Sequence, residues 1–469
     1  MAYSTIDKST NYFFTKTYSG TGSSGAKGVT GVGFQPDFLW IKNRDQSQEH
    51  WLADAVRGTT KFLESDSSNA ESSDGATGLA SFDADGFTLG TGSNRTNQSG
   101  SDMVAWNWLA GGTAPTKTYT VKVVSDSGNK YRFDDFGTSA VTLDLQEGGT
   151  YTFDVSDSSM NSHPFVLGTS SGTDGSYDTG VTYKLDGVTK TYSQYTSGFS
   201  SASSRQLIIT VAGSAPTLYY NCSVHSGMGG SINTNATFGS SNFDGSIQTL
   251  VSANTTAKFS IIRWTGTGSA GTIAHGLGDT PGMIFVKKTS QTDSWFVWHT
   301  YLGQQGKLNL DNNSAIQNDT GYWNNTLPTN QVFSVTSNGA NNASGETYLA
   351  YCFANVTGYC RIGTYVGNGD ADGAHVYTGF RPSFVLTKTT GTDGWRILDN
   401  KRKGYNPNNS LSQPNITQAD SEQTWHDLVS NGFKLRTTDS GDNASGTRYI
   451  YMAIGQSMVG SNNIPATAR

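Results

Sequence analysis

The chain has 469 residues, which is too many for one hydrophobic core, so we expect several domains. Its formal net charge of −6 and the lack of Lys and Arg clusters exclude a phosphate-binding surface, so no nucleic-acid partner is expected. No apolar run reaches the roughly 20 residues that span a bilayer, and the first 14 residues lack the apolar segment of an export signal. We therefore expect neither membrane insertion nor export. The 56 Gly residues, with 14% charged and 12% aromatic residues, favour short strands and tight turns and predict an all-β protein.

The first predicted unit covers residues 1–113. Its run "PDFLWIK" at 36–42 predicts a buried strand, because short apolar runs bounded by Pro and Gly are too short for core helices. The stretch "SFDADGFTLG" at 81–90 alternates apolar and polar residues, as a half-exposed strand does. After an Asn-x-Ser-Gly turn at 97–100, "DMVAWNWLAGG" predicts a closing core strand. A unit of this kind predicts a β-sandwich, jelly-roll or lectin-like.

Residues 116–235 differ in style and predict a separate small β-sandwich. The stretches "KTYTVKVVS" and "VTLDLQEGGTYTFDVS" alternate with period two, and a Gly-Gly turn divides the second. His163 stands directly before Pro164, and Cys222, His225 and Met228 follow at three-residue spacing in "NCSVHSGM". Two imidazoles, a thiolate and a thioether are the ligand types of a type 1 copper site. Copper is therefore the candidate metal, although the chain as a whole does not require a cofactor.

Residues 259–357 and 358–469 repeat the first unit. In each copy a Pro, an apolar run and a Lys are followed by a Trp and then by Asn-x-Ser-Gly. The same interval of 61 residues separates Pro36 from Asn97, Pro281 from Asn342 and Pro382 from Asn443. The chain is therefore predicted to hold three repeated β-sandwich units, with residues 116–235 inserted after the first.

The repeats also carry a resemblance to known proteins. The opening "AYSTIDKSTNYFFTKTYSGTGS", "GFQPDFLWIKNR" and "SFDADGFTLG" with "NQSG" resemble repeat modules in virion proteins of marine tailed phages. This resemblance implies a non-enzymatic tail-fibre, capsid-fibre or decoration component, made in the host cytoplasm and placed on the virion surface. It implies other virion proteins as partners, host surface glycan as a further partner, and a trimer by analogy with phage fibres.

The inserted unit resembles the cupredoxins in its Cys-x-x-His-x-x-Met loop and in "EGGTYTFDVSDSSMNSHPF". The resemblance implies His163 and His225 as imidazole ligands, Cys222 as the thiolate and Met228 as the axial ligand. It also implies a Greek-key sandwich. A structural copper, or zinc in the same pocket, would suit a fibre. The alternatives are a copper protein for electron transfer or metal storage, and a cupredoxin frame used only as a spacer.

Three further points concern side chains outside the copper motif. Trp51, Trp295 and Trp395 are either core residues or aromatic faces on which sugar rings stack. Cys352 and Cys360 are either a disulfide pair or two buried thiols. No P-loop or His-Glu-x-x-His sequence occurs, so we expect no enzyme. A glycan-degrading spike stays open as an alternative, because its two carboxylates can lie far apart in sequence.

Overall fold

The computed structural model describes residues 4–22, 25–75, 77–91 and 93–457. Its strands form β-sandwich sheets, which confirms the prediction of an all-β chain. Within these described residues, no helix is long and apolar enough to cross a membrane. Residues 1–3 and 458–469, which we assigned to the first and third repeats, lie outside the described residues.

The chain divides into two compact units. Unit 1 contains the residues up to Ala110, Ala253–Gly271 and the residues from His275 onward. Unit 2 contains Gly111–Ser252 and Thr272–Ala274. Unit 1 therefore holds most of all three repeats, while unit 2 extends beyond the expected 116–235 at both ends and includes Thr272–Ala274, which we assigned to the second repeat. We call the three repeats of unit 1 module 1 (residues 4–110), module 2 (253–271 and 275–357) and module 3 (358–457).

Module 1 consists of two antiparallel sheets. The larger has the strand order β1-β9-β3-β4-β5-β6, and the smaller has the order β2-β8-β7. Strand β3 holds the predicted run "FLWIKN" and is buried along its whole length, as an apolar run in a central strand should be. The elements are η1 Ser9–Asn11, β1 Phe13–Ser19, β2 Lys27–Thr30, β3 Phe38–Asn43, β4 Trp51–Asp54, β5 Lys61–Glu64, β6 Ser72–Ser73, β7 Leu79–Asp83, β8 Gly86–Leu89 and β9 Asp102–Trp108.

Module 2 repeats the six strands of the larger sheet in the same order, and module 3 repeats the first four of them. In module 2 the order is β22-β29-β24-β25-β26-β27, and in module 3 the two sheets are β30-β37-β32-β33 and β31-β36-β35-β34. The elements of module 2 are β22 Phe259–Thr265, β24 Met283–Lys288, β25 Phe296–His299, η5 Thr300–Leu302, β26 Gly306–Asn309, β27 Gln317–Asn318, α2 Thr320–Trp323, β28 Val332–Val335, α3 Gly339–Asn342 and β29 Thr347–Phe353. Those of module 3 are β30 Cys360–Val366, β31 His375–Tyr377, β32 Arg381–Thr389, β33 Trp395–Asp399, β34 Asn408–Leu411, β35 Ser421–Val429, β36 Gly432–Leu435, α4 Ser440–Asn443 and β37 Arg448–Gln456.

The repeated Asn-x-Ser-Gly turn has the same contacts in every module. Its Asn is fully buried, and its side-chain oxygen accepts a hydrogen bond from the backbone N–H of a facing loop. The donors and distances are Thr21 to Asn97 at 2.8 Å, Thr267 to Asn342 at 3.1 Å and Asn368 to Asn443 at 2.9 Å. Because a buried amide must be hydrogen-bonded, this Asn clamps the loop that follows the first strand. The motif is therefore structural in all three modules.

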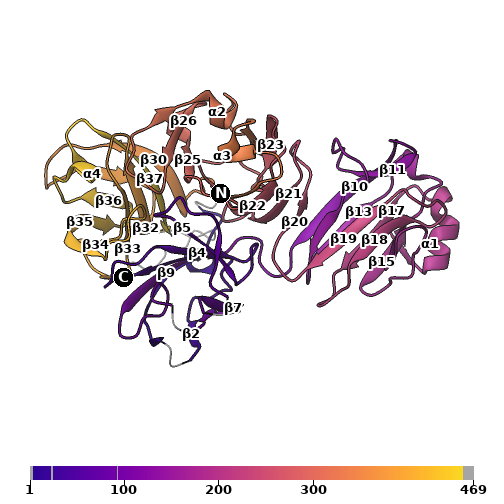
Figure 1. Ribbon diagram of the computed structural model, residues 1–469, viewed down its shortest axis with the longest axis horizontal. Helices are drawn as coiled ribbons and strands as arrows, with labels where there is room; N and C mark the ends of the chain where they lie inside the picture. Colours follow the sequence, from indigo (N-terminus) through magenta and orange to yellow (C-terminus); the bar gives the residue numbers. More distant parts are fainter. Residues whose placement is uncertain (1–3, 23–24, 76, 92, 458–469) are drawn as a thin grey trace. The chain divides into compact units, whose positions relative to one another are not determined.

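Hydrogen bonds from buried Trp side chains join the three modules in a ring. Each bond runs from the indole N–H of one module to an oxygen of the next. The pairs are Trp295 to the carbonyl of Glu64 at 2.8 Å, Trp395 to the carbonyl of Asn309 at 2.7 Å, and Trp106 to Asp399 Oδ2 at 3.0 Å. Module 2 thus contacts module 1, module 3 contacts module 2, and module 1 contacts module 3. Figure 1 shows the strands of the three modules, in indigo, orange and yellow.

Aromatic side chains from all three modules share one core. Phe38 of module 1 stacks on Tyr351 of module 2, with the ring centroids 4.2 Å apart. Trp108 of module 1 packs edge-on against Phe353 of module 2 at 6.3 Å and against Phe384 of module 3 at 5.6 Å. All five rings are buried. Because such rings each bury a large apolar area, the modules depend on one another for their core.

Unit 2 is a two-sheet sandwich with its own core. One sheet has the order β11-β10-β13-β17-β15-β16 and the other has the order β12-β19-β18-β14, and β10 runs parallel to β13 (Figure 1). Between the sheets lie buried aromatic residues such as Tyr119, Phe133, Phe153 and Phe165. The elements are β10 Thr116–Ser125, β11 Asn129–Phe133, β12 Leu143–Gln146, β13 Thr150–Asp154, η3 Ser158–Met160, β14 Phe165–Gly168, β15 Val181–Leu185, β16 Val188–Lys190, α1 Tyr192–Gly198, η4 Phe199–Ser201, β17 Arg205–Thr210, β18 Leu218–Cys222, β19 Gly230–Asn235, β20 Ser240–Asn242, β21 Thr249–Asn254 and β23 Gly271–Ala274.

Candidate metal centre

Two neighbouring strands of unit 2 bring the predicted ligands together. Cys222 is the last residue of β18 and pairs with Phe165, the first residue of β14. His163 lies two residues before β14, so it sits at the same end of the sheet as Cys222. His225 follows in the loop after β18, where its side chain is exposed. The pairing of the two strands therefore converts a separation of 59 residues between His163 and Cys222 into a contact.

Local hydrogen bonds fix the backbone of His163. The turn before it begins at η3, where Asp157 caps the helix by accepting from the N–H of Ser159. The N–H of His163 donates to the carbonyl of Met160 at 2.8 Å, and its own carbonyl accepts from the Tyr131 hydroxyl at 3.0 Å. With both backbone groups hydrogen-bonded, the backbone that carries the imidazole is held in place before any metal binds.

The distances between donor atoms fit a single ion. His163 Nδ1 lies 3.1 Å from His225 Nδ1, and Cys222 Sγ lies 3.9 Å from the first and 3.6 Å from the second. Donors bound at about 2.0–2.3 Å to one ion are separated by roughly 3.1–3.8 Å when their angles are about 100–120°. The three donors span nearly this range, so the residues present fit a metal of the size of copper or zinc.

Met228 lies in the loop after β18, as His225 does. Its side chain is 2% exposed and belongs to the core of unit 2, and its carbonyl accepts from the N–H of Tyr131 at 2.9 Å. The structure thus brings His163, Cys222 and His225 together within 4.8 Å and places Met228 in the core beside their loop.

The electrostatics of the cluster favour a neutral imidazole at His163. Burial lowers the pKa of His163, and the neighbouring His225 lowers it further because two positive charges would repel at this distance. A metal binds imidazole only in its neutral form. His163 is therefore available as a ligand at neutral pH.

A loop beyond the cluster is held by Asn221. Its amide donates to the carbonyls of Ser170 and Asp174 at 2.9 and 2.8 Å, and it accepts from the N–H of Gly172 at 3.2 Å. The Asp174 carboxylate in turn accepts from the N–H of Thr169 at 2.8 Å. Residues 169–174 are therefore ordered by the residue next to Cys222.

The Trp residues that we considered as sugar-binding faces are core residues. Trp51, Trp295 and Trp395 are at most 1% exposed. The indole of Trp51 donates to Asp74 Oδ2 at 3.0 Å, and the other two donate to neighbouring modules. Their ring faces cannot meet a sugar, because they close the cores of the modules.

The cysteines outside the cluster are separate buried thiols. Cys352 and Cys360 are both free and lie at most 3% exposed. Burial raises the pKa of Cys360 to about 12 and raises that of Cys352 as well. Neither thiol is thus activated as a nucleophile or a metal ligand.

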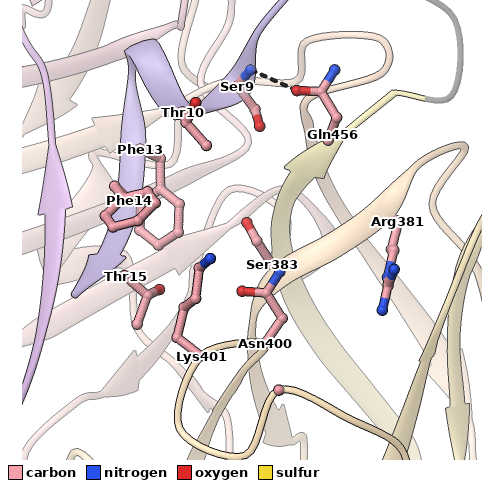
Figure 2. A pocket seen from close by; sticks show the side chains of 11 residues that line it. Ser9, Thr10, Phe13, Phe14, Thr15, Arg381, Ser383, Asn400, Lys401 and Gln456 are labelled. Carbon is pink, nitrogen blue, oxygen red and sulfur yellow. Dashed lines mark hydrogen bonds between the residues drawn. The ribbon is translucent and has the colours of Figure 1, made fainter. Parts of the chain in front are cut away.

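Sequence reasoning missed a polar cavity in unit 1. The cavity has a volume of about 360 Å³, and its lining includes Thr15, Ser383, Asn400 and Lys401 (Figure 2). These residues come from modules 1 and 3, far apart in the sequence, and only Ser383 lies in a repeated motif, directly after its Pro382. The one signal was a deviation between repeats, since Thr15 stands where the other modules have Ile.

Comparison with known proteins gives one family. No curated protein and no solved structure matches the chain. Residues 8–134 and 231–457, about three quarters of the chain, match the family described as a domain of unknown function, DUF7483. The four predicted ligands all lie in residues 135–230, outside the match. The chain therefore belongs to the DUF7483 family and carries its candidate metal centre in a segment that the family match does not cover.

Proposed function

We propose that unit 2 binds one copper ion through His163, Cys222 and His225, with Met228 as the fourth ligand. The convergence of two imidazoles and a thiol within 4.8 Å carries this proposal. Two His, one Cys and a weak Met are the donors of type 1 copper sites, and their order along the chain is similar to that of the cupredoxins. The ion would hold β14 and the loop after β18 together, which is a structural role.

The exposure of the loop favours electron transfer as the alternative role. Val224, directly beside His225, is 61% exposed and offers an apolar contact to a partner protein. Reversible reduction of the bound copper by ascorbate, with a stable Cu(I) form, would support this role. A centre that loses its copper on reduction would support the structural role alone.

Copper binding is tested by adding Cu(II) to the purified protein and recording the absorption spectrum with a metal analysis. We expect an intense visible thiolate-to-copper band and one equivalent of copper. Both should be lost in Cys222→Ser and weakened in His225→Gln. His375→Gln is the matched control, because His375 is also exposed but lies in module 3. No band, or equal spectra for the two His variants, would refute the proposal, and binding of zinc without a band would assign the site to zinc.

We further propose that unit 1 is a structural part of a phage virion that contributes to adhesion or particle stability and has no catalytic role. The closed ring of modules supports this, because a shared aromatic core and buried turns resist proteolysis and unfolding. The resemblance of its repeats to virion modules supports the location. Electron microscopy of particles labelled with antibodies against the chain is the test, and particles without label would refute it.

A further inference from the structure

The cavity of unit 1 lies where the ring closes between modules 1 and 3. Its walls are η1 and β1 of module 1, the start of β32, the loop after β33 and the end of β37. The N–H of Ser9 donates to Gln456 Oε1 at 2.8 Å, and the rings of Phe13 and Phe384 pack with centroids 5.5 Å apart. These contacts hold both sides of the cavity, so its shape is built before a ligand enters.

The lining is polar and positively charged. Lys401 and Arg381 both line the cavity, and none of the described residues that line it is acidic. In Figure 2 the ammonium of Lys401, the oxygen of Asn400 and the hydroxyl of Ser383 point toward the same space, and Arg381 lies to one side. The ammonium of Lys401 lies over the ring of Phe14, 5.1 Å from its centroid, in a cation–π contact.

Two buried polar atoms of the lining have no hydrogen-bond partner among the described residues. They are the hydroxyl oxygen of Thr15, a residue only 3% exposed, and the side-chain oxygen of Asn400. Leaving such an atom unpaired costs roughly 1–3 kcal/mol. A bound molecule with hydroxyl groups would supply the missing partners.

The repeats provide a comparison within the molecule. Strand registers align the modules, since Phe13, Phe259 and Cys360 pair with Trp108, Phe353 and Ile454, and these pair with Phe38, Met283 and Phe384. By this alignment Thr15 corresponds to Ile261 and Ile362. Asp54, His299 and Asp399 are equivalent in the same way, because they pair with Phe38, Met283 and Phe384. Counting on from them, Lys401 is equivalent to Val56 and Tyr301, and Asn400 is equivalent to Ala55 and Thr300.

The polar set is therefore not a requirement of the fold. Two of the three equivalent positions of Thr15 are filled by a buried Ile, and one equivalent of Lys401 is a buried Val. The other modules thus show that apolar residues at these positions are compatible with the same pairing of strands. The unpaired hydroxyl and the lysine at the third junction need another explanation.

We propose that this cavity binds an acidic sugar unit, with its carboxylate on Lys401 and its hydroxyl groups on Thr15, Ser383 and Asn400. An ammonium binds a carboxylate by a charge-assisted hydrogen bond. The unpaired oxygens of Thr15 and Asn400 can bind sugar hydroxyls, and the Ser383 hydroxyl, which donates to the carbonyl of Ile454 at 3.0 Å, can accept from one. The volume lies at the lower end of small-molecule sites, which suits one sugar ring. The proposal does not rest on the metal centre, and it gives the adhesive role of unit 1 a ligand class.

The test is isothermal titration of the full chain with glucuronate, glucose and acetate at low ionic strength. We expect glucuronate to bind at least about tenfold more tightly than either glucose or acetate. Lys401→Met should weaken glucuronate binding at least about tenfold, and Thr15→Ile, which copies the other two modules, should weaken it too. Lys403→Met is the matched control, because Lys403 lies two residues away, pairs with Glu422 at 2.6 Å and does not line the cavity.

Thermal melts of each variant keep the binding result separate from folding. If glucose binds as tightly as glucuronate, the proposed recognition of the carboxylate is wrong. If acetate binds as tightly as glucuronate, the proposed recognition of the sugar hydroxyl groups is wrong. No heat with glucuronate, or equal losses in the Lys401 and Lys403 variants, would overturn the site. A negative result leaves the virion location intact, because particle labelling tests that location independently.

Discussion

Replacing Arg402 by Leu should lower the free energy of unfolding of unit 1 by about 3–5 kcal/mol. Arg402 is fully buried, and its Nε donates to Asp399 Oδ2 at 2.6 Å. Its other nitrogens donate to Ser412 Oγ at 2.7 Å and to the carbonyl of Ile397 at 2.8 Å. The substitution would leave the Asp399 carboxylate buried without its cation. The indole of Trp106 still holds this carboxylate in place, so it cannot move to water.

The magnitude depends on burial rather than on the ion pair as such. Arg436 also pairs with an aspartate, Asp427, at 3.2 Å, but its side chain is 41% exposed. Exposed pairs contribute at most about 1 kcal/mol, so Arg436→Leu is the matched control. Arg402 also pairs with the buried Asp420 at 3.0 Å, and Asp420 keeps Arg44, likewise at 3.0 Å, as a second cation. Adding Asp399→Asn to Arg402→Leu removes the remaining uncompensated charge and should recover part of the loss, because an uncompensated buried charge is the main cost.

Urea unfolding followed by Trp fluorescence measures these differences. All ten Trp residues lie in unit 1 and are buried there, so the signal reports on the ring of modules. A loss for Arg402→Leu no larger than that for Arg436→Leu would refute the argument from burial. A double variant less stable than Arg402→Leu alone would refute the argument from charge.

Three further predictions concern single buried groups. Burial raises the pKa of Asp66 to about 7 in the folded protein, from about 4 in the unfolded chain. The folded protein therefore loses stability as pH rises from about 4 toward 7, where the unfolded chain has already released this proton. Compared with the unsubstituted protein, Asp66→Asn should raise the melting temperature more at pH 8 than at pH 4, as melts at both pH values would show. Trp395→Phe leaves the carbonyl of Asn309 unpaired and should cost about 1–3 kcal/mol in urea unfolding. Asn221→Ala releases the carbonyl of Asp174 and should speed subtilisin cleavage within residues 169–174, and an unchanged cleavage rate would contradict this.

The repeated strands could be predicted because their signals are local. An apolar run between Pro and Lys, and an Asn 61 residues after the Pro, have the same meaning in each copy. The buried amides of Asn97, Asn342 and Asn443 show why that interval is kept, since each clamps a loop of its own module. The His, Cys and Met pattern was also readable, because three of its four residues lie within seven positions.

The contacts between modules could not be predicted in this way. Trp106 and Asp399 are 293 residues apart, and neither stands in a motif that names its partner. Trp295 and Trp395 have the same sequence signature whether they bind a sugar or close a core. Only the ring arrangement decides this, because it places each indole against a carbonyl of the next module.

The metal centre and the ring should behave as independent systems. Cys222 and Met228 belong to the core of unit 2, while the family match covers the residues of the ring and omits those of the centre. An ion that binds only the folded form stabilises it by RT ln(1 + [L]/Kd), about 2.7 kcal/mol at a hundredfold excess over Kd. Added Cu(II) should therefore raise the unfolding midpoint of unit 2 and leave the Trp-detected transition of unit 1 unchanged. Because Arg402 lies in unit 1, Arg402→Leu should shift only the Trp-detected transition of unit 1. A copper-dependent shift of the Trp-detected transition would show that the two units unfold together, and the separation of scaffold and metal centre would be wrong.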